Sequence, residues 1–182
     1  MASLELVIPH ARFAASYRAL VAEFQARGEK LIPFTLALPH DDFDALVARL
    51  RGFASGTDIP AHFVPHSTFW LVADGEVVGV SNLRHRLTDA LLREGGHIGY
   101  GIRPGARRHG YGAALLGKTL REAARLGIQR ALVTCARDNH GSAGVILRNG
   151  GVFEDEAYID ERGEVVQRYW IAIPAIEHAI PG

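Results

Sequence analysis

The N-terminal part of the chain has the hydrophobic spacing of one short strand and two helices. An apolar run over residues 4–8 predicts a strand. Over residues 11–27 the apolar positions recur every three or four residues, which predicts an amphipathic helix. The same spacing over residues 41–51, with acidic residues in the first turn, predicts a second helix that ends before Gly52. The chain therefore opens with a β-α-α pattern.

The rest of the chain alternates between strands and helices. Two β-branched runs around Asp74-Gly75 predict a hairpin over residues 68–83, because this dipeptide favours a tight two-residue turn. The pattern then predicts a strand, a long helix, a strand, a weaker helix and a terminal hairpin over residues 97–103, 110–126, 131–136, 139–148 and 152–173. The full order is β-α-α-β-β-β-α-β-α-β-β. It predicts an α/β protein, more narrowly an α+β fold with a mixed, partly antiparallel sheet.

Composition places this pattern in one domain without a broad electrostatic preference. A chain of 182 residues with 48% hydrophobic and 22% charged residues has the size of one globular domain, and we expect residues 1–182 to form it. Twenty Lys and Arg balance twenty Asp and Glu, which argues against nucleic-acid and membrane-surface partners. No apolar run is long enough to span a membrane, and the single cysteine, Cys135, excludes an internal disulfide. We therefore expect a cytoplasmic protein.

The segment before the long helix has the composition of an anion-binding loop. Residues 107–113 bring basic side chains and two glycines, Gly110 and Gly112, to a predicted helix N-terminus. Unpaired N–H groups and the positive end of the helix dipole attract a phosphate there, and glycine lets the phosphate approach closely. The segment therefore indicates a diphosphate site. The plainer alternative is a solvated basic turn at the start of a helix.

A second pattern overlaps this loop. Residues 112–119 satisfy the P-loop expression G-x-x-x-x-G-K-[ST], in which Lys118 would be the phosphate-binding lysine. A P-loop must be an open loop, whereas Ala113 and the residues after it are strong helix formers within the periodicity of the long helix. We therefore expect Lys118 to lie on a helix surface. A nucleotide-binding P-loop protein is the weaker alternative.

The loop also resembles a known motif, the acyl-CoA pyrophosphate loop of the GCN5-related N-acetyltransferase (GNAT) superfamily. The residues that carry the resemblance are Ile102, Arg103, Pro104, Arg107, Gly110, Gly112 and Ala113. The element order of residues 68–173 fits it, and Asn139 and Ser142 look like the segment that lines the pantetheine arm. The runs 82–86 and 96–101 are similar to a poorly characterised bacterial branch of the superfamily, which defines no substrate.

The resemblance implies a sheet whose fourth and fifth strands splay apart to admit the pantetheine of acetyl-CoA. It implies that the backbone N–H of Tyr100 stabilises the oxyanion and that Ile102 holds the pantetheine. We expect no metal. The remaining residues expected to bind acetyl-CoA are Arg103, Arg107, Arg108, His109, Gly110, Tyr111, Gly112, Ala113, Asn139 and Ser142, with Arg107 and Arg108 as charge partners of the pyrophosphate.

Two positions depart from the family pattern where acid and base groups are expected. The glutamate that many relatives carry four residues before the oxyanion donor is Gly96 here, so His97 is the candidate base and Glu94 its reserve. The tyrosine that protonates the departing thiolate in many relatives is Ile146 here. The thiolate then leaves unassisted or takes its proton from another tyrosine. The candidates are Tyr100, Tyr111 and Tyr158.

The loop and the resemblance together predict an N-acetyltransferase that moves an acetyl group from acetyl-CoA to a primary amine. Direct attack is expected, because no nucleophile for an acyl-enzyme stands out. The acceptor is a small-molecule or peptide amine that the sequence leaves unidentified. A non-catalytic acyl-CoA-binding module is the main alternative, because Gly96 and Ile146 replace the expected base and acid. The terminal hairpin is a candidate homodimer contact.

Overall fold

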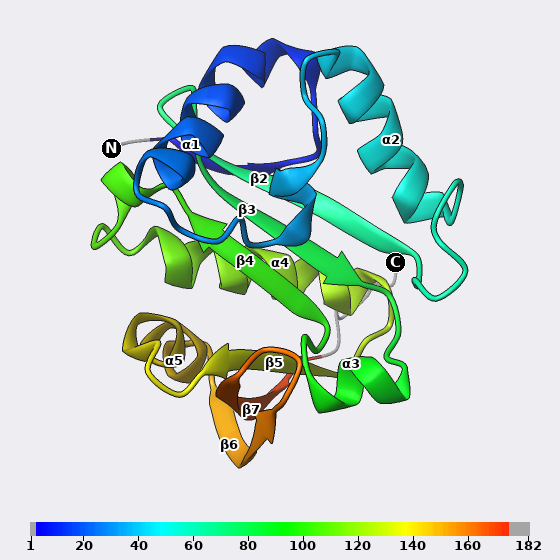
Figure 1. The fold of residues 1–182 in the computed structure, drawn as a ribbon, viewed down its shortest axis with the longest axis vertical. Helices are drawn as coiled ribbons and strands as arrows, with labels where there is room; N and C mark the ends of the chain where they lie inside the picture. The colour runs from blue at the N-terminus through cyan, green and yellow to red at the C-terminus, as the bar shows by residue number, and fades with distance from the viewer. Residues whose placement is uncertain (1–2, 175–182) are drawn as a thin grey trace, which may run out of the picture.

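The computed structural model describes residues 3–174, which form two antiparallel sheets with helices packed around them (Figure 1). The first sheet has the strand order β1-β2-β3-β4, and the second has the order β5-β7-β6. The predicted α+β class is confirmed. The strands are β1 (Leu4–Val7), β2 (His66–Ala73), β3 (Glu76–Arg84), β4 (Ile98–Ile102), β5 (Arg130–Ala136), β6 (Gly151–Ile159) and β7 (Glu164–Ala172).

Helices cover both faces of the first sheet. Figure 1 shows α1 and α2 in front of the sheet and α4 behind it. The helices are α1 (Ala14–Ala26), α2 (Phe43–Ser55), α3 (Asp89–Arg93), α4 (Tyr111–Arg125) and α5 (His140–Arg148). One core lies between α1, α2 and the first sheet, and a second lies on the α4 side and reaches the second sheet. In the part of the chain that the structure describes, no helix has the length and apolar character of a membrane span.

The β2–β3 hairpin confirms the prediction made from Asp74-Gly75. Ala73 pairs with Glu76 across the turn. Asp74 and Gly75 have φ angles of 49° and 85°. Such a left-handed backbone at both positions is what a type I′ hairpin turn requires.

Helix α2 runs past its predicted end. The sequence predicts a stop before Gly52, but the helix continues to Ser55 and ends at Gly56, whose φ is 79°. Phe53 is 2% exposed. Burying such a ring contributes about 1.5–3 kcal/mol, which exceeds the cost of about 1 kcal/mol for a glycine within a helix. Helix α3 is absent from the predicted order because a helix of five residues shows no clear period.

The two sheets meet at the start of β4 and diverge from there. Every strand ladder among residues 3–174 is antiparallel, so two separate sheets replace the mixed sheet that the sequence predicts. At the junction, the N–H of His97 donates to the carbonyl oxygen of Leu132 at 2.7 Å. Beyond it β4 and β5 share no ladder, in keeping with the splayed strands that the resemblance implies. The opening between them is called the β4–β5 wedge below.

Candidate functional site

Strand β4 presents one backbone edge to the wedge. At its end, the N–H of Arg103 donates to the carbonyl of Val78 on β3 at 2.9 Å. Antiparallel neighbours bond through alternate residues. The N–H groups of Tyr100 and Ile102 therefore point the other way, into the wedge. They are placed as the resemblance implies for an oxyanion donor and for a pantetheine contact.

The N-terminus of α4 is an open set of backbone donors. Gly110 precedes the helix with a φ of 81°, a left-handed conformation that strains any residue with a side chain. No side chain caps the helix, and the N–H of Ala114 already bonds to the carbonyl of Gly110 at 3.2 Å. The N–H groups of Tyr111, Gly112 and Ala113 precede that bond and remain for an anion.

The P-loop interpretation is wrong, because residues 112–119 lie inside α4. From Ala114 onward their amide N–H groups bond within the helix, so these residues form no open loop. Packing explains the two glycines of the pattern. A Cβ atom on Gly112 would stand 2.9 Å from a methyl carbon of Val145 on α5, and one on Gly117 would stand 2.9 Å from Oδ1 of Asn149.

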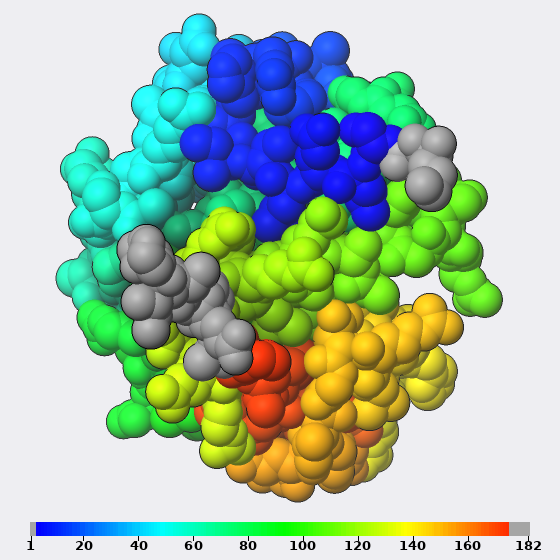
Figure 2. Space-filling model, turned by 180° about the vertical axis from the view of Figure 1, so that it is seen from behind, coloured from blue at the N-terminus to red at the C-terminus, as the bar shows by residue number. Residues whose placement is uncertain are grey.

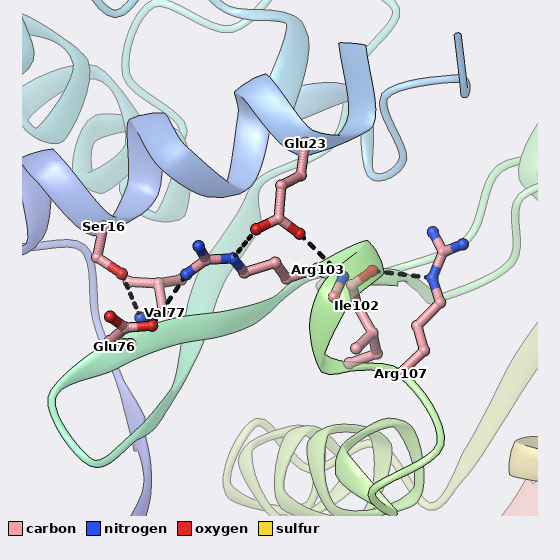
Figure 3. Close-up of polar contacts among 8 residues, drawn as sticks. Ser16, Glu23, Glu76, Val77, Ile102, Arg103 and Arg107 are labelled. Atoms are coloured by element: carbon pink, nitrogen blue, oxygen red, sulfur yellow. Dashed lines mark hydrogen bonds and ion pairs between the residues drawn. The ribbon is translucent and has the colours of Figure 1, made fainter. Parts of the chain in front are cut away.

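A carboxylate on α1 shapes the loop between β4 and α4 (Figure 3). Glu23 accepts one bond from Nε of Arg103 at 2.7 Å and another from the N–H of Gly105 at 2.9 Å. Arg103 also donates to Glu76 on β3 at 3.0 Å. Burial alone would raise the pKa of Glu23, but the bonds from Gly105 and Arg103 outweigh it and lower that pKa. Arg103 is therefore held by two carboxylates, which differs from its expected role as a cofactor ligand.

Arg107 is engaged in the same manner. Two of its nitrogens donate to Glu29 at 3.0 and 2.5 Å, and its Nε donates to the carbonyl of Ile102 at 3.2 Å. The bonds from Arg107 lower the pKa of Glu29. The expected charge partner of the pyrophosphate is thus already paired within the fold. Arg108 is exposed and forms no ion pair with any described residue, so its charge is the one left for a phosphate.

Tyr100 reaches across the wedge to α5. Its hydroxyl lies 2.8 Å from Oγ of Ser142 and donates to the carbonyl of the same residue at 3.3 Å. Burial raises the pKa of Tyr100 well above its usual value, so the phenol keeps its proton. Cys135 on β5 lies close to the same serine hydroxyl, and burial raises the pKa of its thiol. The three side chains meet on the α5 side of the wedge.

The other expected cofactor residues surround this group. Oδ1 of Asn139 accepts the N–H of Ser142 at 3.0 Å, so this side chain starts helix α5. Ile102 and Tyr111 pack their side chains against the core on the α4 side. The exposed ring of His109 stacks on Tyr111 with ring centroids 5.9 Å apart. Figure 2 views the molecule from behind relative to Figure 1 and shows α4 crossing the middle of that face.

The apex of the wedge is a tight junction around Gly96 and His97. A Cβ atom on Gly96 would stand 2.4 Å from the carbonyl oxygen of Leu132. The His97 ring adds a second bond to the same residue, because its Nδ1 accepts the N–H of Leu132 at 3.0 Å. Arg84 donates to the carbonyls of Gly95 and Gly96, both at 3.0 Å. Close backbone packing therefore occupies the position where many relatives carry a glutamate.

This geometry disfavours His97 as the base. Its Nδ1 lone pair already accepts the N–H of Leu132, so the proton of the neutral ring sits on Nε2. His97 is 7% exposed, and burial together with the charge of Arg84 lowers its pKa to about 4. Such a ring takes a proton from an amine poorly at neutral pH. The base role of His97 stays an untested prediction, and the contacts of the ring are those of a positioning residue.

The remaining acid and base candidates are spread over the fold. Glu94 precedes the junction. Its Oε2 lies 3.7 Å from a guanidinium nitrogen of Arg162, which is in the turn between β6 and β7. Tyr158 is 60% exposed on β6, whereas Tyr111 packs behind the first sheet. Among the three tyrosines considered, only Tyr100 reaches into the wedge.

Sequence reasoning missed the carboxylates that shape the cofactor loop. Glu23 lies 80 residues before Arg103, and Glu29 lies 78 residues before Arg107. Both acids belong to α1 or to the segment that follows it, and no local pattern links them to the loop. Their pairing becomes visible only when α1 is packed across the first sheet.

Comparison with known proteins agrees with this geometry. A family model described as the acetyltransferase (GNAT) family matches residues 31–150. Among curated protein sequences, none matches the chain. The solved structure of RimL, a ribosomal L7/L12 alpha-N-protein acetyltransferase, in complex with coenzyme A as a cysteine disulfide, is 19% identical, with 96% of each chain covered and a TM-score of 0.70.

Two further solved structures have the same fold. An acetyltransferase from Salmonella typhimurium that modifies the N-terminal serine of the 50S ribosomal subunit protein L7/L12 is 18% identical, with 94% of this chain and 96% of that chain covered and a TM-score of 0.69. The microcin C7 self-immunity acetyltransferase MccE, in complex with acetyl-CoA and AMP, is 15% identical, with 93% and 92% covered and a TM-score of 0.70. The family model covers more than half of the chain. The chain belongs to the acetyltransferase (GNAT) family.

Proposed function

We propose that this protein transfers an acetyl group from acetyl-CoA directly to a primary amine in the β4–β5 wedge. One observation carries the proposal: two open sets of backbone donors lie at the two ends of one loop. The edge of β4 at Tyr100 and Ile102 suits the pantetheine and the thioester. The uncapped N-terminus of α4 suits the pyrophosphate. Solved structures of the same fold with bound acetyl-CoA support this choice of cosubstrate.

The pyrophosphate would bind to the N–H groups of Tyr111, Gly112 and Ala113, with the Arg108 side chain as its charge partner. The ion pairs of Arg103 and Arg107 hold the loop in the conformation that exposes these groups. Binding therefore depends mainly on backbone donors that are in place before the cofactor arrives. Such preorganisation lowers the cost of binding.

The backbone of β4 performs the central step. With the thioester carbonyl oxygen accepting the N–H of Tyr100, the lone pair of the amine attacks the thioester carbon. Negative charge develops on that oxygen and is stabilised by the same N–H. Collapse of the tetrahedral intermediate breaks the C–S bond, which leaves an amide and the thiolate of coenzyme A.

Proton transfer is assigned to the Tyr100–Ser142 pair and to Glu94. The hydroxyl of Tyr100 contacts the Ser142 hydroxyl on the α5 side of the wedge, so this pair is the proposed proton donor to the departing thiolate. Glu94 is the proposed acceptor of the ammonium proton, and His97 holds the apex. Direct transfer agrees with the state of Cys135, whose buried thiol has a raised pKa.

The acceptor is proposed to be a primary amine of a peptide or a small molecule. Relatives of the same fold include an enzyme that modifies the N-terminal serine of a ribosomal protein and a microcin self-immunity enzyme. A non-catalytic acyl-CoA-binding module is the second candidate, because glycine occupies the glutamate position and His97 is engaged by Leu132.

The test is turnover of acetyl-CoA with a panel of amines that includes a Ser-initiated peptide, free amino acids, polyamines and aminoglycosides. Release of the coenzyme A thiol and the mass of the product are both recorded. We expect one class to be acetylated, with no acetyl group retained on the protein. Tight binding of acetyl-CoA without turnover of any amine would favour the non-catalytic module. No binding of acetyl-CoA would reject the proposal.

A further inference from the structure

Arg84 carries a positive charge that no carboxylate of the described chain compensates. The other partly buried arginines of that part of the chain each bond to a carboxylate; they are Arg103, Arg107 and Arg168. Arg84 is also partly buried but forms no ion pair with any described residue. Burial lowers its pKa. A charge withdrawn from water is costly unless it is paired, so this guanidinium favours an anionic ligand.

The guanidinium of Arg84 is fixed at the apex of the wedge. Arg84 is the last residue of β3, and its backbone N–H donates to the carbonyl of His97 at 2.8 Å. Its Nη1 donates to the carbonyls of Gly95 and Gly96, both at 3.0 Å. These bonds tie the whole residue to the segment that enters β4. The charge is therefore held where the two sheets meet.

The other edge of this guanidinium remains open. An arginine side chain has five N–H groups, and Nη1 supplies two of them. Nε and Nη2 carry the rest, and neither bonds to a described residue. Neither nitrogen is among the buried polar atoms that lack a partner in the described chain, so both reach solvent. Together they form the planar fork that binds the two oxygens of a carboxylate.

The groups around Arg84 supply no negative charge. His66 is its partner across β2 and β3, and His97 is the residue to which its backbone N–H bonds. Burial, aided by the charge of Arg84, lowers the pKa of both rings to about 4, so both are neutral at pH 7. Glu94, just after α3, is held 3.7 Å from a guanidinium nitrogen of Arg162. The open fork therefore keeps its full attraction for an anion.

We propose that Nε and Nη2 of Arg84 bind a carboxylate of the acceptor, so that the substrate is a primary amine with a carboxylate a few bonds from its nitrogen. This inference rests on the proposed function and names the acceptor class of the same site. Arg84 is then a binding residue that sets specificity. The bonds from Nη1 to the two glycine carbonyls hold its fork in place for the carboxylate.

The place of Arg84 limits the length of the acceptor. Its guanidinium contacts Gly96, and the extended chain from Gly96 to Tyr100, the proposed oxyanion donor, spans roughly 10–13 Å. Contacts of about 3 Å at each end leave about 4–7 Å between the amine nitrogen and the carboxylate. About three to five methylene groups bridge that distance. The α-amine of a free amino acid lies too close to its own carboxylate, whereas an ω-amino acid or a peptide N-terminus followed by an acidic residue fits.

The test compares amines that differ only in the charge at their far end. The probe 5-aminopentanoate carries a carboxylate, and 5-aminopentanamide carries a neutral amide in its place. Calorimetry gives the affinity of each for the protein saturated with coenzyme A, and kcat/KM is measured for each with acetyl-CoA. A series of ω-amino acids of increasing chain length locates the preferred span. The peptides Ser-Asp-Ala-amide and Ser-Asn-Ala-amide repeat the comparison for a peptide source of the carboxylate.

Three variants test whether the carboxylate binds to Arg84. Arg84→Gln removes the charge but keeps an N–H donor for the glycine carbonyls. Arg84→Lys keeps the charge on a shorter side chain. Arg86→Gln is the matched control, because Arg86 lies two residues further along, is exposed and forms no ion pair with any described residue. The affinity for acetyl-CoA is measured for every variant.

We expect the intact protein to prefer 5-aminopentanoate to its amide about tenfold in both measurements, the effect of one charged hydrogen-bonded pair. Arg84→Gln should abolish that preference and Arg86→Gln should retain it, with the affinity for acetyl-CoA unchanged in both. Arg84→Lys should keep part of the preference and move the preferred acceptor to a longer chain, because the ammonium ends closer to β3. If Arg84→Gln fails to fold, this shift in chain length decides the role of Arg84.

The outcomes separate this inference from the proposed function. If acetyl-CoA fails to bind the intact protein, the proposed function is wrong and this inference falls with it. If acetyl-CoA binds but no amine is acetylated, the transfer is wrong, while the two calorimetric affinities still test the site at Arg84. A preference within either probe pair supports the site and identifies the source of the carboxylate.

Three results would overturn the role of Arg84 and leave the acetyl-CoA site intact. The first is equal treatment of carboxylate and amide by the intact protein in both probe pairs. The second is a preference that survives Arg84→Gln or is lost in Arg86→Gln. The third is a preferred chain length that stays the same in Arg84→Lys.

Discussion

The cofactor end of the wedge and its apex are built from different groups. At the proposed cofactor end, backbone N–H groups of β4 and α4 are open, while Glu23 and Glu29 hold the loop through paired arginines. At the apex, the His97 ring and the bare backbone of Gly96 close directly on Leu132. One end leaves its backbone donors without partners within the fold, whereas the other is closed by bonds within the fold. The cofactor end and the apex therefore depend on separate parts of the chain.

The closed apex gives the largest expected effect. Gly96→Ala forces a side chain into a left-handed backbone, at about 1–2 kcal/mol, and against the Leu132 carbonyl, at about 1–3 kcal/mol more. The matched control is Gly163→Ala, where φ is also positive but nothing lies within 4 Å. In urea unfolding, Gly96→Ala should lose more free energy of unfolding than the control. The difference should be about 1–3 kcal/mol, the cost of the contact with the Leu132 carbonyl. Equal losses would mean that the apex is not tightly packed.

The second prediction concerns the proton donor in the wedge. Tyr100→Phe keeps the backbone N–H but removes the hydroxyl that meets Ser142, so kcat should fall about 100-fold while the affinity for acetyl-CoA stays unchanged. Tyr158→Phe, on the exposed face of β6, should alter neither quantity. An unchanged kcat for Tyr100→Phe would show that the thiolate leaves without help from this residue.

The third prediction uses pH to probe the buried histidines. The pKa of His97 is lowered from 6.5 to about 4, so the folded protein holds this ring neutral where the unfolded chain protonates it. The free energy of unfolding should therefore be highest above pH 6.5 and fall as the pH drops toward 4, and His66 adds a similar contribution. In His97→Asn one such group is gone, so the decline should be shallower by urea unfolding across this window. An equal slope would place the histidine ring in solvent.

The smallest expected effect tests the open end. Arg108→Ala should weaken acetyl-CoA binding only a few-fold, because an exposed charge contributes about 0.2–1 kcal/mol. Lys118→Ala, on α4, should leave the affinity for acetyl-CoA unchanged. Calorimetric titration of each variant with acetyl-CoA measures both affinities. If the protein bound Mg-ATP and Lys118→Ala greatly reduced that affinity, the P-loop interpretation would be supported instead.

The difference between the two ends also explains what the sequence could predict. The structure of the cofactor end follows from neighbouring residues. A strand, a loop with Gly110 at positive φ and a helix follow one another, so residues 97–126 alone predict this arrangement. The apex could not be predicted in this way, because His97 and Leu132 lie 35 residues apart and meet only when the two sheets form. Helix α2 continues beyond Gly52 because the free energy gained by burying Phe53 exceeds the cost of a glycine within a helix.

Amide hydrogen exchange, measured residue by residue with and without acetyl-CoA, tests the central claim most directly. Without ligand, the N–H groups of Gly99 and Gly101 should be protected by β3, whereas those of Tyr100 and Ile102, which face the wedge, should exchange faster. Acetyl-CoA should slow exchange at Tyr100 and Ile102 and at the start of α4. Protection confined to other segments, with Tyr100 and Ile102 unchanged, would contradict the wedge as the site of acetyl transfer.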